Sequence, residues 1–520
     1  MLSELDYVIV GIYVVALISL GLFISKVSTP HQSKTVGYFL ADKGLPWWAV
    51  GASLVASNIS AEQIIGMSGS GYAIGLAIAS YEWMAAVTLI IVAKFMLPIF
   101  IKHNILTMPQ YLENRYDIRV RNVMAIFWLA VYLFVNLTSI LWLGGLAIAT
   151  VTGIDALYGM IFLALFSTAY SLYGGLKAVA YTDIIQVVLL VLGGLALSYV
   201  ALNSLSNGRG AIDGFILLTE QAPSHFDLIL DENNPHYNSL PGISVLIGGL
   251  WIMNLSYWGF NQYIIQRALA AKSIREAQKG ITFAAFLKLL MPIIVVLPGI
   301  VAFVKLPNLA GPDQAYPSML ALMPEGIKGI IFAALIAAIV SSLSSMTNSI
   351  STIFTMDLYK HYKTDKSETH YLLVGKTVVF LSLIIGIVLA KPLLGKFDQA
   401  FQYIQEFTGF FTPGVVVIFL LGMFWRKASA NGALAAAVGS AIFSVLLKAF
   451  WPELPFMDRV GLVFILCLIT CVLFSLLDGQ AKASDKETDI SEIDFKTTYS
   501  FNILAFIICL ILAQLYYVWW

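Results

Sequence analysis

The 520-residue chain has few charged side chains for its length. Asp, Glu, Lys and Arg together make up 12% of the residues, whereas 59% are hydrophobic, and the mean hydropathy is +0.84. A water-soluble protein of this size would need more charge on its surface, so the composition indicates a chain embedded in lipid. The formal net charge of zero also argues against a nucleic-acid partner, which would require a basic face.

The sequence also lacks the motifs of several enzyme and pump classes. No Walker loop, dinucleotide fingerprint or kinase motif is present, so ATP-driven transport loses its main requirement. All six histidines fall in predicted loops, which leaves no imidazole for an intramembrane proton relay or haem site. Cys467 and Cys471 lie one helical turn apart without a nearby histidine, which makes a poor metal site. We expect no enzyme activity and no organic cofactor.

Hydrophobic runs of about 20 residues recur along the chain, and each is long enough to cross a hydrocarbon core of roughly 30 Å. They predict an all-α polytopic membrane protein with about fourteen transmembrane helices. The predicted spans are 7–25, 46–72, 80–101, 123–150, 156–173, 180–203, 242–266, 280–304, 327–356, 372–390, 398–424, 430–449, 460–477 and 500–518.

The distribution of lysine and arginine predicts the orientation of these spans. Roughly 21 of the 30 basic residues fall in alternate loops, which we place in the cytoplasm because basic loops stay on that side. Both termini are then external. The first span follows Glu4 and Asp6 rather than a basic segment, so we expect a retained span and not a cleaved signal.

Two predicted spans are interrupted by polar residues. The stretch 52–86 carries Asn58, Ser60, Glu62, Gln63 and Glu82 among glycines and apolar residues. Polar groups are costly at this depth unless they face a cavity, a partner or a ligand. A helix that opens there would free backbone carbonyls to bind a small cation.

The second interruption lies five spans later, in GGLWIMNLSYWGFNQYIIQR, with polar residues from Asn254 to Gln262. Two broken spans at this separation are typical of an inverted repeat with its site at the membrane midplane. Lys288 lies in the middle of the next span, too deep to reach the interface, and is expected to donate into a wet cavity. Lys448 lies near a span end and is expected to extend to the interface.

Four further polar patterns have both a functional and a packing explanation. Asn136 either contacts a ligand or only packs between helices. Asp183 either marks a cation exit route or is interfacial. The Ser341–Asn348 stripe offers hard oxygen ligands suited to Na⁺, although such stripes also join helices. Gln405, with neighbouring amides and aromatic rings in FDQAFQYIQEFTGFF, suits a neutral polyhydroxyl ligand.

The motifs now in view resemble the sodium/solute symporter family, and within it the bacterial sodium/galactose (sodium/glucose-type) symporters. The resemblance covers nearly the whole chain in order and is carried by ASNISAEQIIGMSGSGYAIGLAIASYEW, FVNLTSIL, YSLYGGLKAVAYTD, GFNQYIIQRALAAKS, AAIVSSLSSM and QYIQEFTG. It implies a multi-pass protein of a bacterial inner membrane and a leucine-transporter-type core of two inverted five-helix repeats. The implied organisation is an extra N-terminal helix and loop (1–45), a first repeat (46–203), an external loop (204–241), a second repeat (242–424) and three added helices (425–520).

The resemblance also implies the roles of individual residues. Sodium would be held by the carbonyls of Ala56, Ile59 and Ala338 and the hydroxyls of Ser341 and Ser342, with Asp183 on its exit route. The sugar would be bound by Gln63, Glu82, Asn254, Lys288 and Gln405, supported by Asn58, Asn136 and Tyr257. The external gate would be Met67, Tyr81 and Phe401, and the internal gate Tyr257 with Trp258.

One position departs from the family pattern. A sugar-contacting serine of the family is Ala85 here, which removes one hydroxyl contact worth about 1 kcal/mol. The expected function is uptake of a neutral hexose, galactose or glucose, coupled to Na⁺ by alternating access. The alternatives are a Na⁺ symporter for another small solute, such as an amino acid, nucleoside or polyol, and a sugar-gated channel or sensor.

Overall fold

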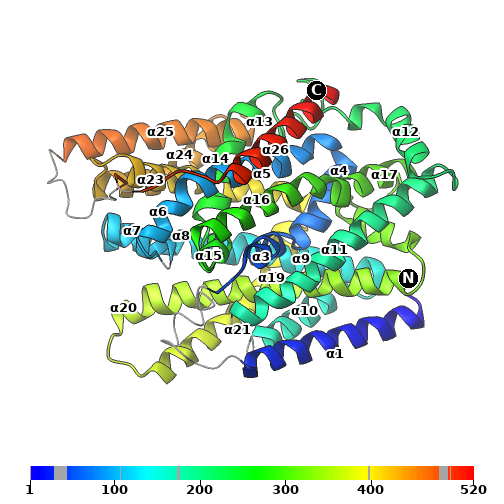
Figure 1. Cartoon of the computed structure of the whole chain (residues 1–520), viewed down its shortest axis with the longest axis horizontal. Helices are drawn as coiled ribbons and strands as arrows, with labels where there is room; N and C mark the ends of the chain where they lie inside the picture. The colour runs from blue at the N-terminus through cyan, green and yellow to red at the C-terminus, as the bar shows by residue number, and fades with distance from the viewer. Residues whose placement is uncertain are drawn as a thin grey trace.

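The computed structural model describes residues 2–27, 44–105, 107–171, 176–395, 397, 399–478, 490–491 and 493–520, without the side chains of 17, 18, 20–27, 170, 171 and 176–183. Helices of the described segments run along one common direction in an elongated bundle (Figure 1). Both chain ends and α12 (Ala211–Gln221) lie toward one end of this bundle, while α7 (Met108–Arg115) and α20 (Lys360–Tyr362) lie toward the other.

The first half of the chain forms long helices that are divided by short π-helical turns. Its other elements are α1 (Glu4–Val27), α3 (Trp47–Asn58), η2 (Glu62–Gly66), α4 (Met67–Ala73), η3 (Leu76–Ala79), α5 (Ser80–Ile91), η4 (Val92–Met96), α6 (Leu97–Lys102), α8 (Ile118–Ala130), η5 (Val131–Leu137), α9 (Thr138–Thr152), α10 (Ala156–Ser171) and α11 (Leu176–Leu205). Of these short elements, η2, η4 and η5 are π-helical and η3 is a 3₁₀ turn.

The second half begins after a long connecting segment that contains α12 and η6 (Pro223–His225). Its elements are α13 (Ser244–Ile247), α14 (Gly249–Leu255), η7 (Ser256–Phe260), α15 (Gln262–Leu269), α16 (Ile274–Met291), η8 (Pro292–Val296), α17 (Leu297–Lys305), η9 (Pro312–Gln314), α18 (Ala315–Met319), η10 (Leu320–Leu322), α19 (Ile327–Thr352), η11 (Ile353–Tyr359), α21 (Glu368–Leu394), α22 (Ala400–Thr408), α23 (Thr412–Phe424), α24 (Ala430–Phe450), α25 (Phe456–Leu477) and α26 (Tyr499–Val518).

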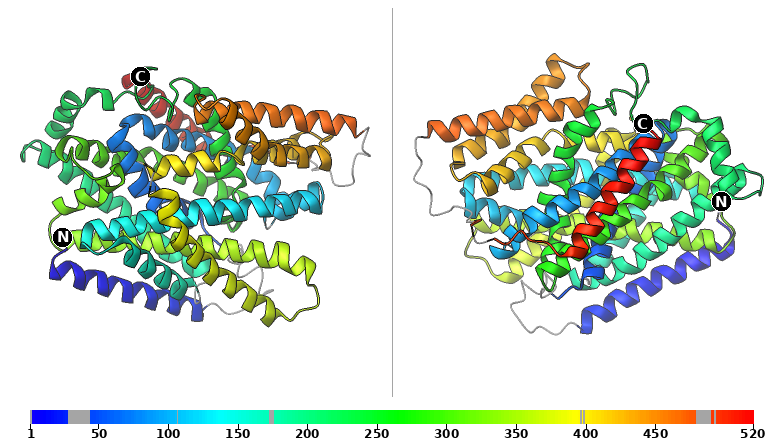
Figure 2. Two further views of the ribbon diagram at one scale, coloured as in Figure 1. Left: turned by 180° about the vertical axis from the view of Figure 1, so that it is seen from behind. Right: turned by 45° about the horizontal axis from the view of Figure 1, so that its top comes forward.

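The all-α membrane architecture predicted from hydropathy is confirmed. Within the described segments, nine continuous helices are long and apolar enough to cross a bilayer, and the pair α22 and α23, bent by 46°, makes a tenth if it is one span. Of the other predicted spans, 7–25 lies in the 24-residue helix α1, whose side chains are only partly described, and 46–72, 156–173 and 242–266 are broken or shorter, so the total of about fourteen stays a prediction. Sequential helices of the two halves interleave in the bundle, and α1 and α26 lie on opposite sides of it (Figure 2).

Both predicted interruptions are real breaks in the helices. α3 ends at Asn58, Ile59 leaves the helical region with φ −73° and ψ 89°, and the chain resumes as the π turn η2. In the second interruption α14 passes into the π turn η7, and Asn261 is extended with φ −82° and ψ 122°. π turns occur most often at functional sites, because the wider turn displaces side chains and carbonyls from the regular ladder.

Close packing of α3 against α16 brings two parts of the site together. Gly51 and Gly280 face each other at this crossing, and a Cβ on Gly51 would lie 2.6 Å from the Gly280 carbonyl oxygen. Small residues let membrane helices approach closely where no hydrophobic effect drives them together. The close approach sets the broken end of α3 within reach of Lys288 on α16.

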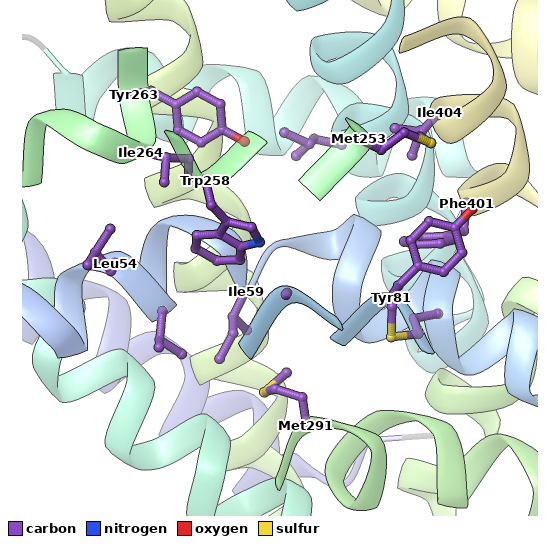
Figure 3. Close-up of a cluster of buried hydrophobic side chains, with 14 of the residues drawn as sticks. Leu54, Ile59, Tyr81, Met253, Trp258, Tyr263, Ile264, Met291, Phe401 and Ile404 are labelled. Atoms are coloured by element: carbon purple, nitrogen blue, oxygen red, sulfur yellow. The ribbon is translucent and has the colours of Figure 1, made fainter. Parts of the chain in front are cut away.

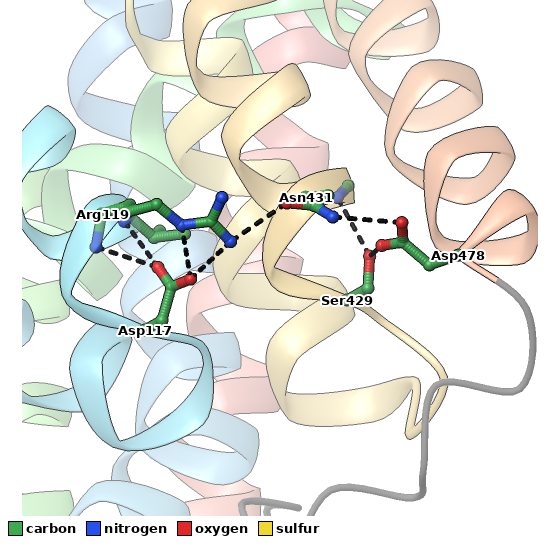
Figure 4. A network of polar contacts seen from close by, with 7 residues as sticks. Asp117, Arg119, Ser429, Asn431 and Asp478 are labelled. Carbon is green, nitrogen blue, oxygen red and sulfur yellow. Dashed lines mark hydrogen bonds and ion pairs between the residues drawn. The ribbon is translucent and has the colours of Figure 1, made fainter.

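At the end of the bundle that we predict to be cytoplasmic, a polar network joins α8 to α24 and α25 (Figure 4). Asp117 caps α8 by accepting from the backbone N–H groups of Arg119 and Val120. Arg119 donates to Asn431 at 3.0 Å, and Asn431 in turn donates to Asp478 at 3.1 Å. The network links the start of α8 to the start of α24 and the end of α25.

Candidate functional site

A continuous network of buried polar side chains lies where the two broken helices meet. The Lys288 ammonium donates to Oε2 of Glu82 at 2.6 Å and also to Oδ1 of Asn58. The Gln63 amide donates to Oε1 of Glu82, and the Asn58 amide donates to the Tyr257 hydroxyl at 3.1 Å. Five elements, α16, α5, α3, η2 and η7, thus supply one network. Buried polar groups are stable only when they are satisfied in this way.

A cavity opens beside this network. Seven of the eight residues assigned to the sugar by resemblance line it, and these are Asn58, Gln63, Glu82, Asn136, Asn254, Tyr257 and Gln405. Lys288 is fully buried behind Glu82 and is absent from the cavity wall. Asn254 Nδ2 is buried and has no hydrogen-bond partner in the described part of the chain, which leaves a donor for a ligand. Ala85 lines the cavity at the position where the family pattern has serine.

Two aromatic residues close one side of the cavity. Tyr81 on α5 and Phe401 on α22 meet edge to face with ring centroids 5.0 Å apart, and both are buried. Figure 3 shows this pair on the opposite side of the hydrophobic cluster from Trp258 and Tyr263. Met67, the third residue of the predicted external gate, is fully buried and does not line the cavity.

Tyr257, which belongs to the predicted internal gate, also lines the cavity. Its ring contacts Trp258 edge to face at 5.1 Å, and its hydroxyl is 2.8 Å from the Tyr263 hydroxyl. The Lys288 ammonium lies 4.9 Å from the centroid of the Trp258 ring, within the range of a cation–π contact. Tyr257 therefore connects the wall of the cavity to the polar network.

The predicted sodium ligands lie on two helices that pack together, α3 and α19. The backbone hydrogen bonds that cross the break in α3 join Ile59 N to Val55 O and Ile64 N to Ser60 O, and neither uses the carbonyl of Ala56 or Ile59. Ala338, Ser341 and Ser342 are buried on α19. The Ser342 hydroxyl has no hydrogen-bond partner among the described residues, as a group that awaits a cation would.

Asp183, the predicted waystation of the ion, falls in the part of α11 whose side chains lie outside the described residues. The residues that the structure describes contain no group of three or more Asp, Glu, His or Cys side chains that could hold a metal ion. A monovalent cation held by carbonyls and hydroxyls requires no such cluster.

Sequence reasoning missed several residues of the cavity wall, which are Trp128, Tyr132, Thr408, Phe411 and Thr412. Tyr132 lies four residues before Asn136, one helical turn away, and this spacing could have identified it. Its hydroxyl donates to Oδ1 of Asn261 at 2.7 Å and so closes the wall between η5 and the second break. The other residues are aromatic or hydroxyl-bearing side chains with no distinctive signal in the sequence.

Comparison with known sequences gives consistent results. Residues 38–439 match the sodium:solute symporter family. The chain is 50% identical to the sodium/glucose cotransporter of Vibrio parahaemolyticus over 100% of its own length and 99% of that protein. It is 33% identical to the human sodium/myo-inositol cotransporter 2, covering 82% of this chain and 67% of that protein.

Solved structures with the same fold are also transporters. One is the substrate-bound, outward-open state of a Na⁺-coupled sialic acid symporter, with a TM-score of 0.78, 25% identity, and coverage of 91% of this chain and 98% of that one. A nucleobase-cation-symport-1 family transporter in a closed conformation gives a TM-score of 0.55 at 12% identity, covering 86% and 98% of the two chains, and shows likeness of fold alone.

Proposed function

The chain belongs to the sodium:solute symporter family, and from this premise we propose that it couples inward Na⁺ movement to the uptake of galactose or glucose by alternating access. It is a multi-span, sodium-coupled transporter and not an enzyme. The observation that carries the choice of a sugar is the cavity at the two helix breaks, where amides, two carboxyl groups and a tyrosine converge. Such groups hydrogen-bond hydroxyls, while rings cover the apolar face of a pyranose.

The sugar would be held by Gln63, Glu82, Asn254, Gln405 and Tyr257, with Asn58 and Asn136 supporting them. Lys288 would act through Glu82 and Asn58, to which it donates, rather than by lining the cavity. Ala85 cannot supply the hydroxyl of the family serine, so selectivity among hexoses would differ by about 1 kcal/mol from that of relatives with the serine.

Sodium would bind the free carbonyls at the end of α3 and the hydroxyls of Ser341 and Ser342. An ion at this position would hold α3 and α19 in the arrangement that presents Asn58 and Gln63 to the sugar. Coupling is then the difference in sugar affinity between the ion-bound and ion-free states. One charge entering at about 150 mV gains about 3.5 kcal/mol, and a tenfold gradient adds about 1.4 kcal/mol.

We also propose the two-repeat organisation of the core, with repeats at 46–203 and 242–424, the N-terminal helix and loop 1–45, the external loop 204–241 and the C-terminal helices 425–520. Two broken helices related in position, α3 and α14, support this division. The termini would be external in a bacterial inner membrane. The positive-inside distribution of basic residues supports that orientation.

The alternatives make different predictions. A channel would conduct far faster than a carrier, and a sensor would bind sugar without moving it. Uptake of labelled galactose into proteoliposomes, driven by a sodium gradient with and without a membrane potential, tests the proposal. We expect uptake in sodium that rises with an inside-negative potential. Equal uptake when choline replaces sodium would rule out the coupling.

A further inference from the structure

The two carboxylates of the cavity wall, Glu62 and Glu82, have different electrostatic surroundings. Glu82 is 2% exposed and is neutralised by Lys288 at 2.6 Å. Glu62 has no ion pair among the described residues of the chain. The pair cancels in charge, so Glu62 is the carboxyl of the cavity wall that lacks a charged partner among the described residues, and a charged partner is what a buried carboxylate needs.

Among the described residues, the one side chain that donates to the Glu62 carboxylate is the amide of Asn136, whose Nδ2 lies 3.4 Å from Oε1. Glu62 is partly exposed in the cavity, whereas Gln63 beside it is buried against Glu82. Both side chains reach the same cavity because they lie in the π turn η2, which is wider than an α turn. The carboxylate therefore faces the space in which the sugar would bind.

A carboxylate in a low-dielectric cavity favours a ligand that brings a positive charge. We propose that the cavity binds a hexose bearing a protonated amino group, with Glu62 holding the ammonium while the remaining hydroxyls take the network used by the neutral sugar. The inference rests on the proposed sugar transport and names a second substrate class for the same site. An ammonium replaces a hydroxyl with little change in volume, and it offers three donors to a carboxylate that is short of them.

This inference is tested by competition. Unlabelled sugars compete with labelled galactose for uptake into proteoliposomes, and a sodium gradient drives that uptake. The competitors are galactose, 2-amino-2-deoxygalactose and 6-amino-6-deoxygalactose, which place the amine at two positions on the ring. At about pH 7, where the amine is mostly protonated, at least one amino sugar should compete about tenfold better than galactose. At about pH 9, where the amine of 2-amino-2-deoxygalactose is neutral, any advantage of that sugar should disappear while galactose competes as before.

Two variants locate the effect. Glu62→Gln removes the acidic group but keeps the shape of the side chain. It should bring the ratio of competitive potencies, amino sugar over galactose, to one or below. Glu220→Gln removes an exposed acid in α12, far from the cavity wall, and should keep the wild-type ratio. A ratio that is unchanged in Glu62→Gln overturns the assignment to Glu62.

The wild-type protein alone can also overturn the inference, even if a variant does not fold. Sodium-dependent galactose uptake with no advantage for either amino sugar at about pH 7 would reject this inference and leave the proposed function intact. Galactose uptake that does not depend on sodium would reject the proposed function itself.

Discussion

The Lys288 ammonium lies 2.6 Å from Oε2 of Glu82, across the contact between α16 and α5, and the two side chains are 0% and 2% exposed. A charge pair this deeply buried is held in place by the cost of leaving either member alone. The pair also fixes Asn58 and Gln63, which line the cavity. The Lys288–Glu82 pair therefore contributes both to the stability of the fold and to the shape of the site.

Lys288→Met should lower the free energy of unfolding by about 3–5 kcal/mol, because Glu82 would be left charged and unpaired. The double variant Glu82→Leu with Lys288→Met should recover most of that loss, since an apolar pair needs no compensation. It should still fail to take up galactose. Thermal unfolding in detergent and uptake by proteoliposomes measure the two effects. If Lys288→Met alone is as stable as the wild type, the pair is not buried as described.

Gln405 and Gln402 form a matched pair on α22. Gln405 lines the cavity, whereas Gln402 does not. Gln405→Ala should weaken galactose binding by about tenfold, the loss of one or two hydrogen bonds to hydroxyls. Gln402→Ala should leave the affinity for galactose unchanged. Equal affinities in the two variants would remove Gln405 from the proposed site.

Glu406, on α22 close to its bend into α23, forms ion pairs with two basic side chains of α24 and α25. Its carboxylate accepts from Lys448 at 2.6 Å and from Arg459 at 3.0 Å. The Arg459 side chain is 5% exposed and that of Lys448 is 43% exposed.

These exposures predict unequal effects. Glu406→Ala should cost about 1–3 kcal/mol because it leaves the buried Arg459 without an acceptor. Lys448→Met should cost at most about 1 kcal/mol, as for an exposed pair. Unfolding temperatures of the two variants decide the point, and a larger effect of Lys448→Met would contradict it.

His225 gives the loop 204–241 a pH-dependent stability. Its Nε2 donates to the Tyr72 carbonyl at 3.2 Å, and its ring stacks on Phe303 at 3.9 Å. Burial lowers the pKa of His225, and His236 lowers it further, while the bond to Tyr72 opposes both. The unfolded chain then binds a proton more readily than the folded one, so stability is full above the unfolded pKa of about 6.5 and falls as pH drops below it.

The unfolding temperature should therefore fall between about pH 7 and pH 5. His225→Gln, which keeps an N–H donor, should remove part of that fall. His361→Gln, at an exposed position, should not. An identical pH profile in wild type and His225→Gln would contradict the assignment.

Much of this architecture could be predicted from the sequence, for identifiable reasons. Polar residues at Asn58–Gln63 and Asn254–Gln262 are costly in lipid, and both predicted interruptions are breaks in the structure. The depth of Lys288 predicted a polar environment, but its partner Glu82 lies 206 residues away and no local pattern reports it. Lys448 was expected only to reach the interface, and its contact with Glu406 is likewise a product of tertiary packing.

Other features have no local signature. A π turn depends on which carbonyl each N–H selects, and hydropathy does not encode that choice, so η2 and η7 could not be placed in advance. The wall residues Trp128 and Phe411 lie in apolar surroundings and resemble packing residues until the helices are assembled. Sequence therefore located the polar centre of the site more completely than its aromatic wall.

The central claim is that an ion at the broken end of α3 prepares the cavity for sugar. Its most direct test is the dissociation constant of galactose in saturating sodium and in choline, for the wild type and for Ser342→Ala, with Ser349→Ala as the control because its hydroxyl is bonded to Ser345 O at 2.9 Å. The account predicts at least about tenfold tighter binding in sodium for the wild type and the control, and little difference for Ser342→Ala. Equal galactose affinity in sodium and choline for the wild-type protein would contradict it.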